Sequence, residues 1–212
     1  MSSTIPSPTP TPTEFGVGAR ITLCVMRDDF SDVVTSALAA ADARAGDVAV
    51  ETGDVSTLVS GDEQALVRYA SELIAAAGRS GAHVATVLHF SRGCPGEVVC
   101  ELPGGVGPRR AELPTAERTG VQATAEWALY PLDDSGRGGA EPDHMRDIEA
   151  AVDLARRKGT FRGSQQFVTR LEGDVADVIA TVAAGWVLVG RSVQHVTSHV
   201  TLSIASPSAA TR

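Results

Sequence analysis

Histidines on a strand-like segment are the first residues whose spacing could support chemistry. His195 and His199 are four residues apart, and in a helix both imidazoles would lie on one face, where they could share a metal ion. However, apolar and polar residues alternate along 195–204, which predicts a strand. At a rise of ~3.3 Å per residue the imidazoles would stand ~13 Å apart. His83 and His89 fail in the same way, so we expect no metal site.

Cys94 is the second candidate, in Arg-Gly-Cys-Pro-Gly-Glu after another strand-like segment with histidines nearby. A Cys–His pair could carry out nucleophilic catalysis. In a second copy of this segment, described below, Ser206 holds the same position, and no helix begins near it to lower a thiol pKa. A small polar role therefore suits the position better than a thiolate. The glycines at 104–107 lack the Lys-Ser/Thr of a phosphate loop.

Polar side chains gather on one face of these two strands. In the later strand the polar face comprises His195, Thr197, His199, Thr201 and Ser203, opposite the mostly apolar Val196, Ser198, Val200, Leu202 and Ile204. In the earlier strand the equivalent face comprises His83, Ala85, Val87, His89 and Ser91. Such a row is either a solvated surface, a polar interface between sheets, or the floor of a ligand site.

Both strands belong to one unit that occurs twice in the chain. Residues 54–95 align with residues 166–207 without a gap, at a constant shift of 112, and ten of the 42 pairs are identical. The identities fall where elements begin and end: a Gly-Asp pair, a Gly-Arg-Ser triplet and a closing proline. Upstream, Asp29 pairs with Asp143 at a shift of 114, so the intervening loops differ by two residues.

Each copy has the periodicities of an α+β unit. Apolar residues at helical spacing predict helices over 30–41 and 66–77 in the first copy, and over 145–155 and 175–186 in the second. Strands are predicted over 20–26, 48–51, 54–60 and 83–91, and over 124–130, 161–165, 166–171 and 195–204. The order is β-α-β-β-α-β, the ferredoxin-like unit, with an antiparallel sheet and both helices on one face.

Helix ends carry their usual signals. Asp62 and Asp174 follow a glycine and precede apolar helical periods, which predicts N-caps. Gly78 and Gly190 close these periods, and we expect them to end the helices in the left-handed conformation.

The predicted organisation is therefore two repeats with a tail and a connector. Residues 1–17 are rich in Pro, Ser and Thr and are expected to be a disordered tail. The first repeat spans 18–96 and the second 122–208; the Gly/Pro-rich connector at 97–121 could hold a short strand near 98–102.

Composition narrows the classes of function. A net charge of −8 disfavours non-specific nucleic-acid binding and suits a cationic ligand. Three cysteines are too few for a disulfide scaffold, no segment approaches the ~18 apolar residues of a membrane span, and the N-terminus resembles no targeting peptide. We expect a cytoplasmic protein.

Several short motifs, in order across both copies, resemble the YkoF family. They are Met-Arg-Asp-Asp-Phe at 26–30, Thr-Gly-Asp-Val-Ser-Thr at 52–57, Ser-Arg-Gly-Cys-Pro-Gly at 91–96, Ala-Leu-Tyr-Pro at 128–131, Asp-His-Met at 143–145, Glu-Ala-Ala-Val-Asp at 149–153, Gly-Thr-Phe at 159–161 and Leu-Ser-Ile-Ala-Ser-Pro-Ser at 202–208. The likeness covers nearly all of 20–208.

This resemblance implies tandem ACT-like domains in a homodimer. Each repeat would bind thiamine or its hydroxymethylpyrimidine moiety, in the salvage and uptake of thiamine precursors, with a functional link to a transporter. It implies no enzymatic reaction and no cofactor beyond that ligand.

An aminopyrimidine needs an apolar wall, hydroxyl or N–H donors and an acceptor for its amine. In the first copy Phe30 is the candidate wall and Asp29 or Asp54 the candidate acceptor; the candidate polar groups are Thr52, Ser56, Thr57, Ser91 and Cys94. In the second copy the candidates are His144, Gln166, Thr169, Ser203 and Ser206. Because these sets differ, we expect two unequal pockets. The alternative is that Asp29 only caps a helix and that Ser56 and Thr57 are ordinary strand residues.

Three functions remain open at this point. The first is a non-enzymatic binding protein for thiamine or hydroxymethylpyrimidine. The second is an ACT-like regulatory module for an amino acid or another metabolite, since a fold does not decide its ligand. The third is an enzyme that depends on Cys94.

Overall fold

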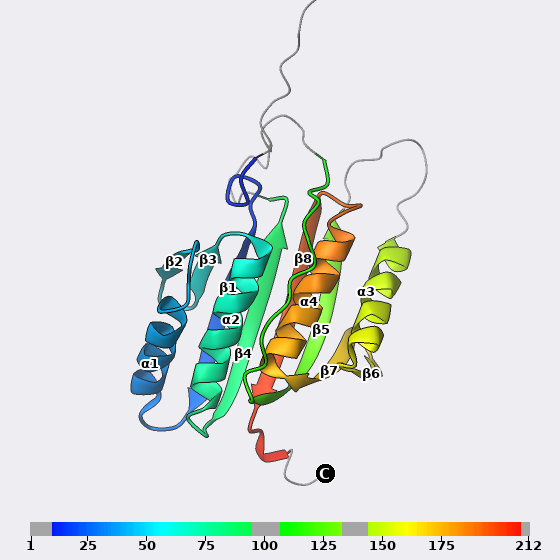
Figure 1. Cartoon of the computed structure of the whole chain (residues 1–212). Helices are drawn as coiled ribbons and strands as arrows, with labels where there is room; N and C mark the ends of the chain where they lie inside the picture. Colours follow the sequence, from blue (N-terminus) through cyan, green and yellow to red (C-terminus); the bar gives the residue numbers. More distant parts are fainter. Residues whose placement is uncertain (1–9, 95–106, 133–143, 209–212) are drawn as a thin grey trace, which may run out of the picture.

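Two βαββαβ units share one sheet in the computed structural model (Figure 1), which describes residues 10–94, 107–132 and 144–208. The first unit contains β1 (Gly18–Met26), α1 (Phe30–Asp42), β2 (Ala49–Thr52), β3 (Thr57–Ser60), α2 (Glu63–Gly78) and β4 (His83–Arg92). The second contains β5 (Gln122–Leu132), α3 (His144–Lys158), β6 (Phe161–Gln165), β7 (Val168–Asp174), α4 (Val175–Val189) and β8 (His195–Ile204). The predicted class of tandem ferredoxin-like repeats is confirmed.

The two units join edge to edge through β4 and β8. The strand order is β2-β3-β1-β4-β8-β5-β7-β6, and every pairing is antiparallel. Leu88 pairs with Val200, its own counterpart at the 112-residue shift, so an approximate two-fold axis passes through this pair. Each unit thereby satisfies the backbone groups of a strand that would otherwise be a sheet edge.

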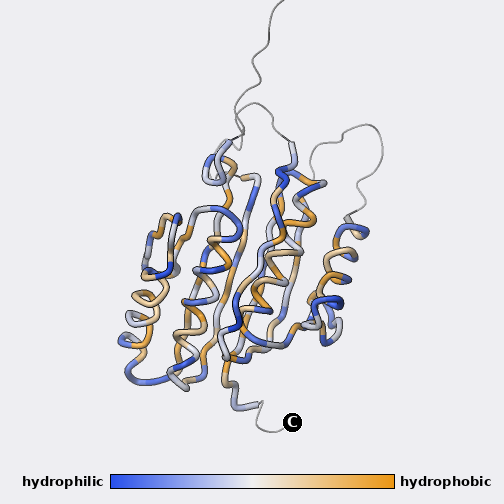
Figure 2. Tube along the Cα trace, in the orientation of Figure 1, coloured by the Kyte–Doolittle hydropathy of each residue, from blue (hydrophilic) through white to orange (hydrophobic). Residues whose placement is uncertain are grey.

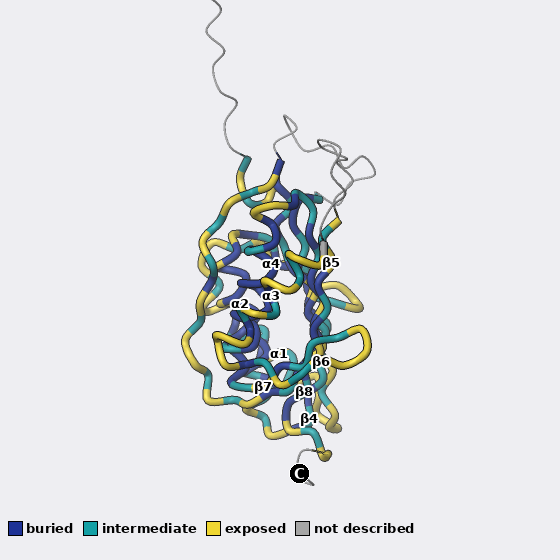
Figure 3. The backbone as a smooth tube through the Cα atoms, turned by 90° about the vertical axis from the view of Figure 1, so that its right-hand side faces the viewer, coloured by how far each residue is buried: buried dark blue, intermediate teal, exposed yellow. Residues whose placement is uncertain are grey.

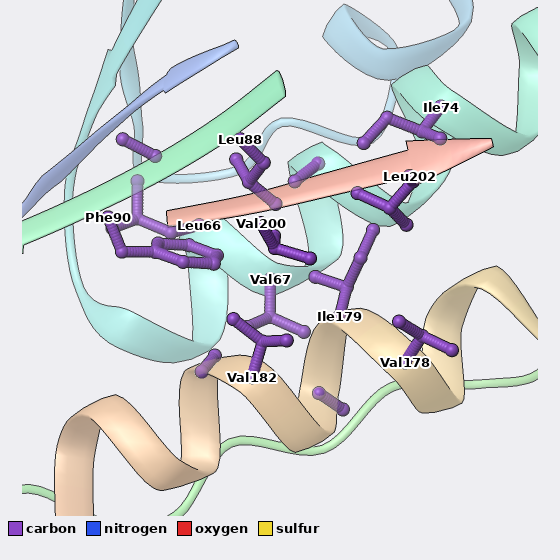
Figure 4. Close-up of a cluster of buried hydrophobic side chains, with 14 of the residues drawn as sticks. Leu66, Val67, Ile74, Leu88, Phe90, Val178, Ile179, Val182, Val200 and Leu202 are labelled. Carbon is purple, nitrogen blue, oxygen red and sulfur yellow. The ribbon is translucent and has the colours of Figure 1, made fainter. Parts of the chain in front are cut away.

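All four helices cover one face of this sheet, and the edge-on view shows buried residues between the two layers (Figure 3). Along β4 and β8 the even-numbered residues are buried and the odd-numbered ones are not, as the predicted alternation requires. Hydrophobic and hydrophilic residues accordingly interleave along helices and strands (Figure 2). At the centre, α2 and α4 pack over Leu88 and Val200, with Val67 and Val182 between the helices (Figure 4).

Both predicted N-caps are confirmed. The Asp62 carboxylate accepts a hydrogen bond from the Ala65 amide at 2.7 Å, and Asp174 accepts one from Ala176 at 2.9 Å. Asp174 also accepts from the amides of Thr119 and Gly120. Burial alone would raise the pKa of Asp174, but the hydrogen bonds from Thr119, Ala176 and Gly120 favour the charged form and hold it below its usual value. This carboxylate therefore anchors the end of the connector to α4.

The expectation for the two helix-ending glycines is wrong. α2 runs through Gly78 to a right-handed C-cap at Arg79, and Gly190 has φ −67°. Both are instead points of close approach: a Cβ on Gly78 would come within 2.8 Å of Val121, and one on Gly190 within 2.8 Å of the Arg92 side chain. At each position the absence of a Cβ leaves room for a side chain of a neighbouring strand or of the connector.

The predicted tail extends too far into the folded part. Phe15 and Val17 are each 1% exposed and belong to the core, and the Gly93 amide donates to the Phe15 carbonyl at 3.0 Å. The Pro/Ser/Thr-rich composition of the segment gives no sign of this packing, because only Phe15 and Val17 anchor it in the core. Residues 1–9 and the strand expected near 98–102 lie outside the described residues. Within the described ranges, none of the helices is long and apolar enough to cross a bilayer.

Candidate functional site

A cleft of about 650 Å³ opens in the second unit between α3, the end of β5 and the turn between β6 and β7. We call it the α3 cleft. Its apolar wall comprises Trp127, Ala128, Leu129, Tyr130, Met145, Ile148, Val152, Phe167 and Val168, and its polar groups are Glu149, Asp153, Arg156, Ser164 and Thr169. A mostly apolar cleft of this size with a few polar groups is typical of a small-molecule site.

Trp127 forms a fixed part of the wall. Its indole N–H donates to Ser198 Oγ at 2.8 Å, and both residues are buried. The ring packs on Gly185 of α4 so closely that a Cβ there would come within 2.6 Å of it. The hydrogen bond and the glycine fix the orientation of the ring, and only 3% of the residue is exposed, so Trp127 forms a rigid, nearly buried base of the cleft.

Carboxylates line the α3 side of the cleft. Glu149 and Asp153 are one helical turn apart and share a face. Asp153 accepts from Arg156 at 2.5 Å, and the Arg156 guanidinium lies 4.5 Å from the ring centre of Phe161. Glu149 is exposed and has no hydrogen bond or ion pair with the described residues. Its carboxylate is therefore available to accept from an amine or to face a positive charge.

Phe167 sits at the tip of the β6–β7 turn in an unusual state. Its side chain is 95% exposed, and its φ of 69° is in the left-handed region, which is strained for a bulky residue. Backbone strain of about 1–3 kcal/mol is retained mainly where a function requires the conformation. Together with its place on the rim of the cleft, this identifies Phe167 as a candidate lid over a bound ring.

Replacing Phe167 by asparagine should separate binding from stability. Asparagine tolerates the left-handed conformation, so we expect the melting temperature to stay unchanged or to rise. Affinity for a ring-shaped ligand should fall by about 0.5–1.5 kcal/mol, the value of an aromatic contact beyond its buried area. Thermal unfolding and calorimetric titration measure the two effects. A loss of stability together with affinity would contradict the lid role.

In the first unit several of the predicted site residues lie near one another, but within the described part of the chain they do not line a cleft comparable to the α3 cleft. Thr52 Oγ1 lies 3.2 Å from Thr57 Oγ1, and Thr57 is buried on the helix face, at the position equivalent to Thr169. Phe30 begins α1 and is 57% exposed, and Asp54 is exposed in the β2–β3 turn. Asp29 precedes α1 without capping it and pairs instead with Arg27. Phe30, Asp54 and the threonine pair therefore lie around the end of this unit that corresponds to the α3 cleft.

The other predicted residues do not join these sets. Ser56 accepts from Arg20 at 3.2 Å, and Ser203 is 3.1 Å from His83 Nε2. Both, with Ser91, lie on the open sheet face, so the sheet separates them from Thr57 and Thr169. Cys94 and Ser206 follow β4 and β8, and because these central strands are antiparallel, their C-terminal ends lie at opposite ends of the sheet. Ser206 hydrogen-bonds Ser208 at 2.8 Å.

In the second unit, Thr169 lines the α3 cleft. Gln166 is exposed beside Phe167 in the same turn, and His144 is the first residue of α3, directly before Met145. The side chain of His144 lies outside the described residues. Of the predicted second-copy set, Thr169 thus lines the cleft, Gln166 and His144 neighbour it in sequence, and Ser203 and Ser206 are remote.

The open sheet face pairs two histidines that the sequence did not connect. His89 and His199 are direct partners across β4 and β8, with ring centres 6.4 Å apart. Burial, followed by the charges of His199 and Arg20, lowers the pKa of His89. Among the described residues, no group of three or more His, Cys, Asp or Glu side chains could hold a metal ion.

Sequence reasoning missed most of the cleft wall, namely Trp127, Ile148, Val152 and Phe167. One signal was available. The run Glu-Ala-Ala-Val-Asp at 149–153 places Glu149 and Asp153 on one helix face beside an apolar stripe. The exposure of Phe167 has no comparable signal, because it depends on the turn.

Comparison with known proteins agrees with the two-unit architecture. The model of the YKOF-related family matches residues 16–97 and 122–209, one match on each unit. The chain is 32% identical over 191 residues to a Bacillus subtilis (strain 168) protein named "Putative HMP/thiamine-binding protein YkoF". That alignment covers 90% of this chain and 91% of the relative. The chain therefore belongs to the YKOF-related family.

Proposed function

We propose that this chain is a non-enzymatic binding protein for thiamine or its hydroxymethylpyrimidine moiety, with one site in each unit. The name of the Bacillus subtilis relative supports this ligand. The observation that carries the proposal is the α3 cleft, which combines a fixed aromatic wall at Trp127 with carboxylates at Glu149 and Asp153.

The groups of the cleft complement an aminopyrimidine. The flat ring packs between Trp127 and the lid at Phe167. Its exocyclic amine donates to Glu149, and the hydroxyls of Ser164 and Thr169 donate to ring nitrogens. The thiazolium of thiamine adds a positive charge that is favoured by Glu149, whose carboxylate is unpaired among the described residues, whereas Asp153 is already paired with Arg156.

An ACT-like module for an amino acid is the second candidate, and it fits the cleft less well. An amino acid needs a cation for its carboxylate, and Arg156 already contacts Asp153 and Phe161. The tandem ACT-like architecture is the feature that favours this second function.

The two sites are unequal in this proposal. At the 114-residue shift, Glu149, Asp153 and Arg156 correspond to Thr35, Ala39 and Asp42. The strand register makes Ile21 the counterpart of Trp127. The first site therefore lacks counterparts of Trp127 and of the acidic pair, and we expect it to bind a cationic ring more weakly.

We further propose that the protein is a cytoplasmic homodimer that serves the salvage or uptake of thiamine precursors, with a functional link to their transporter. The open sheet face, with its row of hydroxyls and imidazoles, supports self-association because it is a broad surface that the helices do not cover.

Thermal unfolding with each ligand tests the function. A ligand at one hundred times its dissociation constant should stabilise the protein by ~2.7 kcal/mol. We expect thiamine and hydroxymethylpyrimidine to raise the melting temperature and a panel of amino acids to leave it unchanged. Calorimetric titration then gives the stoichiometry. A response to an amino acid alone would favour the regulatory module, and no response to either pyrimidine would reject the proposal.

A further inference from the structure

We propose that a second cleft, in the first unit, binds the phosphate group of a small molecule. It lies between α2 and residues 115–119 of the connector and encloses about 720 Å³. We call it the connector cleft. Its lining comprises Arg44, Gln64, Arg68, Ser71, Glu72, Arg79, Thr115, Ala116, Glu117, Arg118 and Thr119.

The charge of this lining is opposite to that of the chain. The protein carries a net charge of −8, yet four arginines face two carboxylates, Glu72 and Glu117, in this cleft. An acidic protein that gathers guanidinium groups around one hollow creates a local positive potential there. The cleft therefore favours an anion, whereas the α3 cleft favours a cation.

Glu72 organises two of these arginines. Its carboxylate accepts from Arg44 at 3.2 Å and from Arg79 at 2.5 Å. Because one carboxylate pairs with two guanidinium groups, one positive charge remains uncompensated. Each guanidinium has five N–H donors, and most of them remain available to a ligand. Planar guanidinium groups suit phosphate oxygens because they donate two parallel hydrogen bonds.

Arg68 contributes a charge that no described carboxylate neutralises. Its guanidinium makes one long hydrogen bond, 3.4 Å to the Ala45 carbonyl, and no ion pair with the described residues. It projects from the same face of α2 as Glu72, one turn earlier. Arg44, Arg68 and Arg79 all line the cleft, Arg68 from within α2 and the other two from just after the ends of α1 and α2.

Ser71 adds an observation that is independent of charge. It lines the cleft and is only 4% exposed, yet its hydroxyl oxygen has no hydrogen-bond partner among the residues that the structure describes. A buried hydroxyl without a partner is costly, and a serine within a helix normally bonds the carbonyl one turn earlier. The oxygen is closed to solvent in this conformation, so the hydroxyl would donate to a phosphate oxygen after it rotates toward the cleft.

The opposite wall is held in place by the protein itself. The Gln64 side chain donates to the Thr115 carbonyl at 2.7 Å and accepts from the Thr115 amide at 3.0 Å. Arg118 pairs with Asp177 of α4 at 2.8 Å. These contacts fix the position of the connector against α2 and α4, so the cleft is formed by the protein's own contacts. Its volume fits a small phosphorylated molecule.

Calorimetric titration of the full chain with inorganic phosphate and with glycerol 3-phosphate tests the proposal. We expect saturable binding of at least one probe, weakened ~10-fold or more by Arg68→Gln, which removes charge-assisted hydrogen bonds. Arg110→Gln is the matched control, because Arg110 is an exposed arginine outside the cleft. Tighter binding of glycerol 3-phosphate identifies an organic phosphate, and equal binding identifies free phosphate.

Ser71→Ala distinguishes a ligand group from a structural one. The variant should melt at a higher temperature because the buried hydroxyl is gone, and should bind the probe several-fold more weakly. Absence of saturable binding at millimolar concentrations of both probes overturns the proposal. So does an equal loss of affinity in Arg68→Gln and Arg110→Gln, which would indicate only general attraction to a charged surface. Thiamine binding at the α3 cleft is unaffected by either result.

Discussion

Replacing Glu63 by leucine is expected to lower the free energy of unfolding by about 3–5 kcal/mol, the usual cost of leaving a buried charge without its partner. Glu63 lies 3.5 Å from the Arg92 guanidinium and 3.3 Å from that of Arg109. The Arg92 side chain is 0% exposed and that of Glu63 only 4%. Chemical denaturation followed by circular dichroism measures the loss.

The surroundings of Arg92 explain why the effect should be large. Burial lowers the pKa of Arg92 to about 10, Glu63 opposes this shift, and Arg109 and Arg191 add to it. The residue therefore stays charged near neutral pH. Its guanidinium faces the rings of Trp186 at 5.5 Å and Phe15 at 5.9 Å, and its Nε and Nη1 atoms have no hydrogen-bond partner in the described part of the chain. Glu63 is thus its main compensating charge.

Two variants control this prediction. Glu63→Leu combined with Arg92→Met removes both charges, and we expect it to be more stable than Glu63→Leu alone. Glu72→Leu disrupts ion pairs to partners that are 67% and 47% exposed, so its cost should stay within about 1 kcal/mol. If Glu63→Leu cost no more than Glu72→Leu, the buried cluster would not carry the stability assigned to it.

Filling the α3 cleft is expected to abolish binding of thiamine and hydroxymethylpyrimidine at that site. Ile148 is half-buried on the α3 wall, and Ile148→Trp would project an indole into the 650 Å³ space. Affinity should fall ~100-fold or more, since the ring and the ligand compete for one volume and burial of the ligand supplies most of the binding energy. Calorimetric titration measures the change, and the melting temperature without ligand should change little because the cleft is open.

Val34→Trp is the matched variant in the first unit, at the position equivalent to Ile148. It should leave the tighter site intact and remove only a weaker one. Glu149→Gln tests the polar side of the same site and should cost about 1.5–3 kcal/mol of binding if its carboxylate accepts from the amine. Full binding by Ile148→Trp, with loss in Val34→Trp, would reverse the ranking of the sites. Full binding by both would place the ligand elsewhere.

The sequence by itself determined the features that depend on local spacing. The shift of 112 residues, the strand at 195–204 and the N-caps at Asp62 and Asp174 were all predictable. Alternation follows from the two-residue period of a strand, and a cap needs only the next turn of helix. The same alternation correctly assigned the two faces of β4 and β8, including the polar row at His89, His199 and Ser203.

Only the tertiary structure determined which residues of different helices and strands lie next to one another. The repeat shows that Ser91 and Ser203 are equivalent positions. It does not show that the candidate cleft lies on the other face of the sheet. Nothing local to Glu63 indicates Arg92, 29 residues later, and the pairing of His89 with His199 exists only because β4 and β8 join the units. Contacts at long sequence separation depend on strand register and helix packing, which no local pattern encodes. The histidines that first suggested chemistry therefore lie on the open face, while the candidate cleft formed around Trp127.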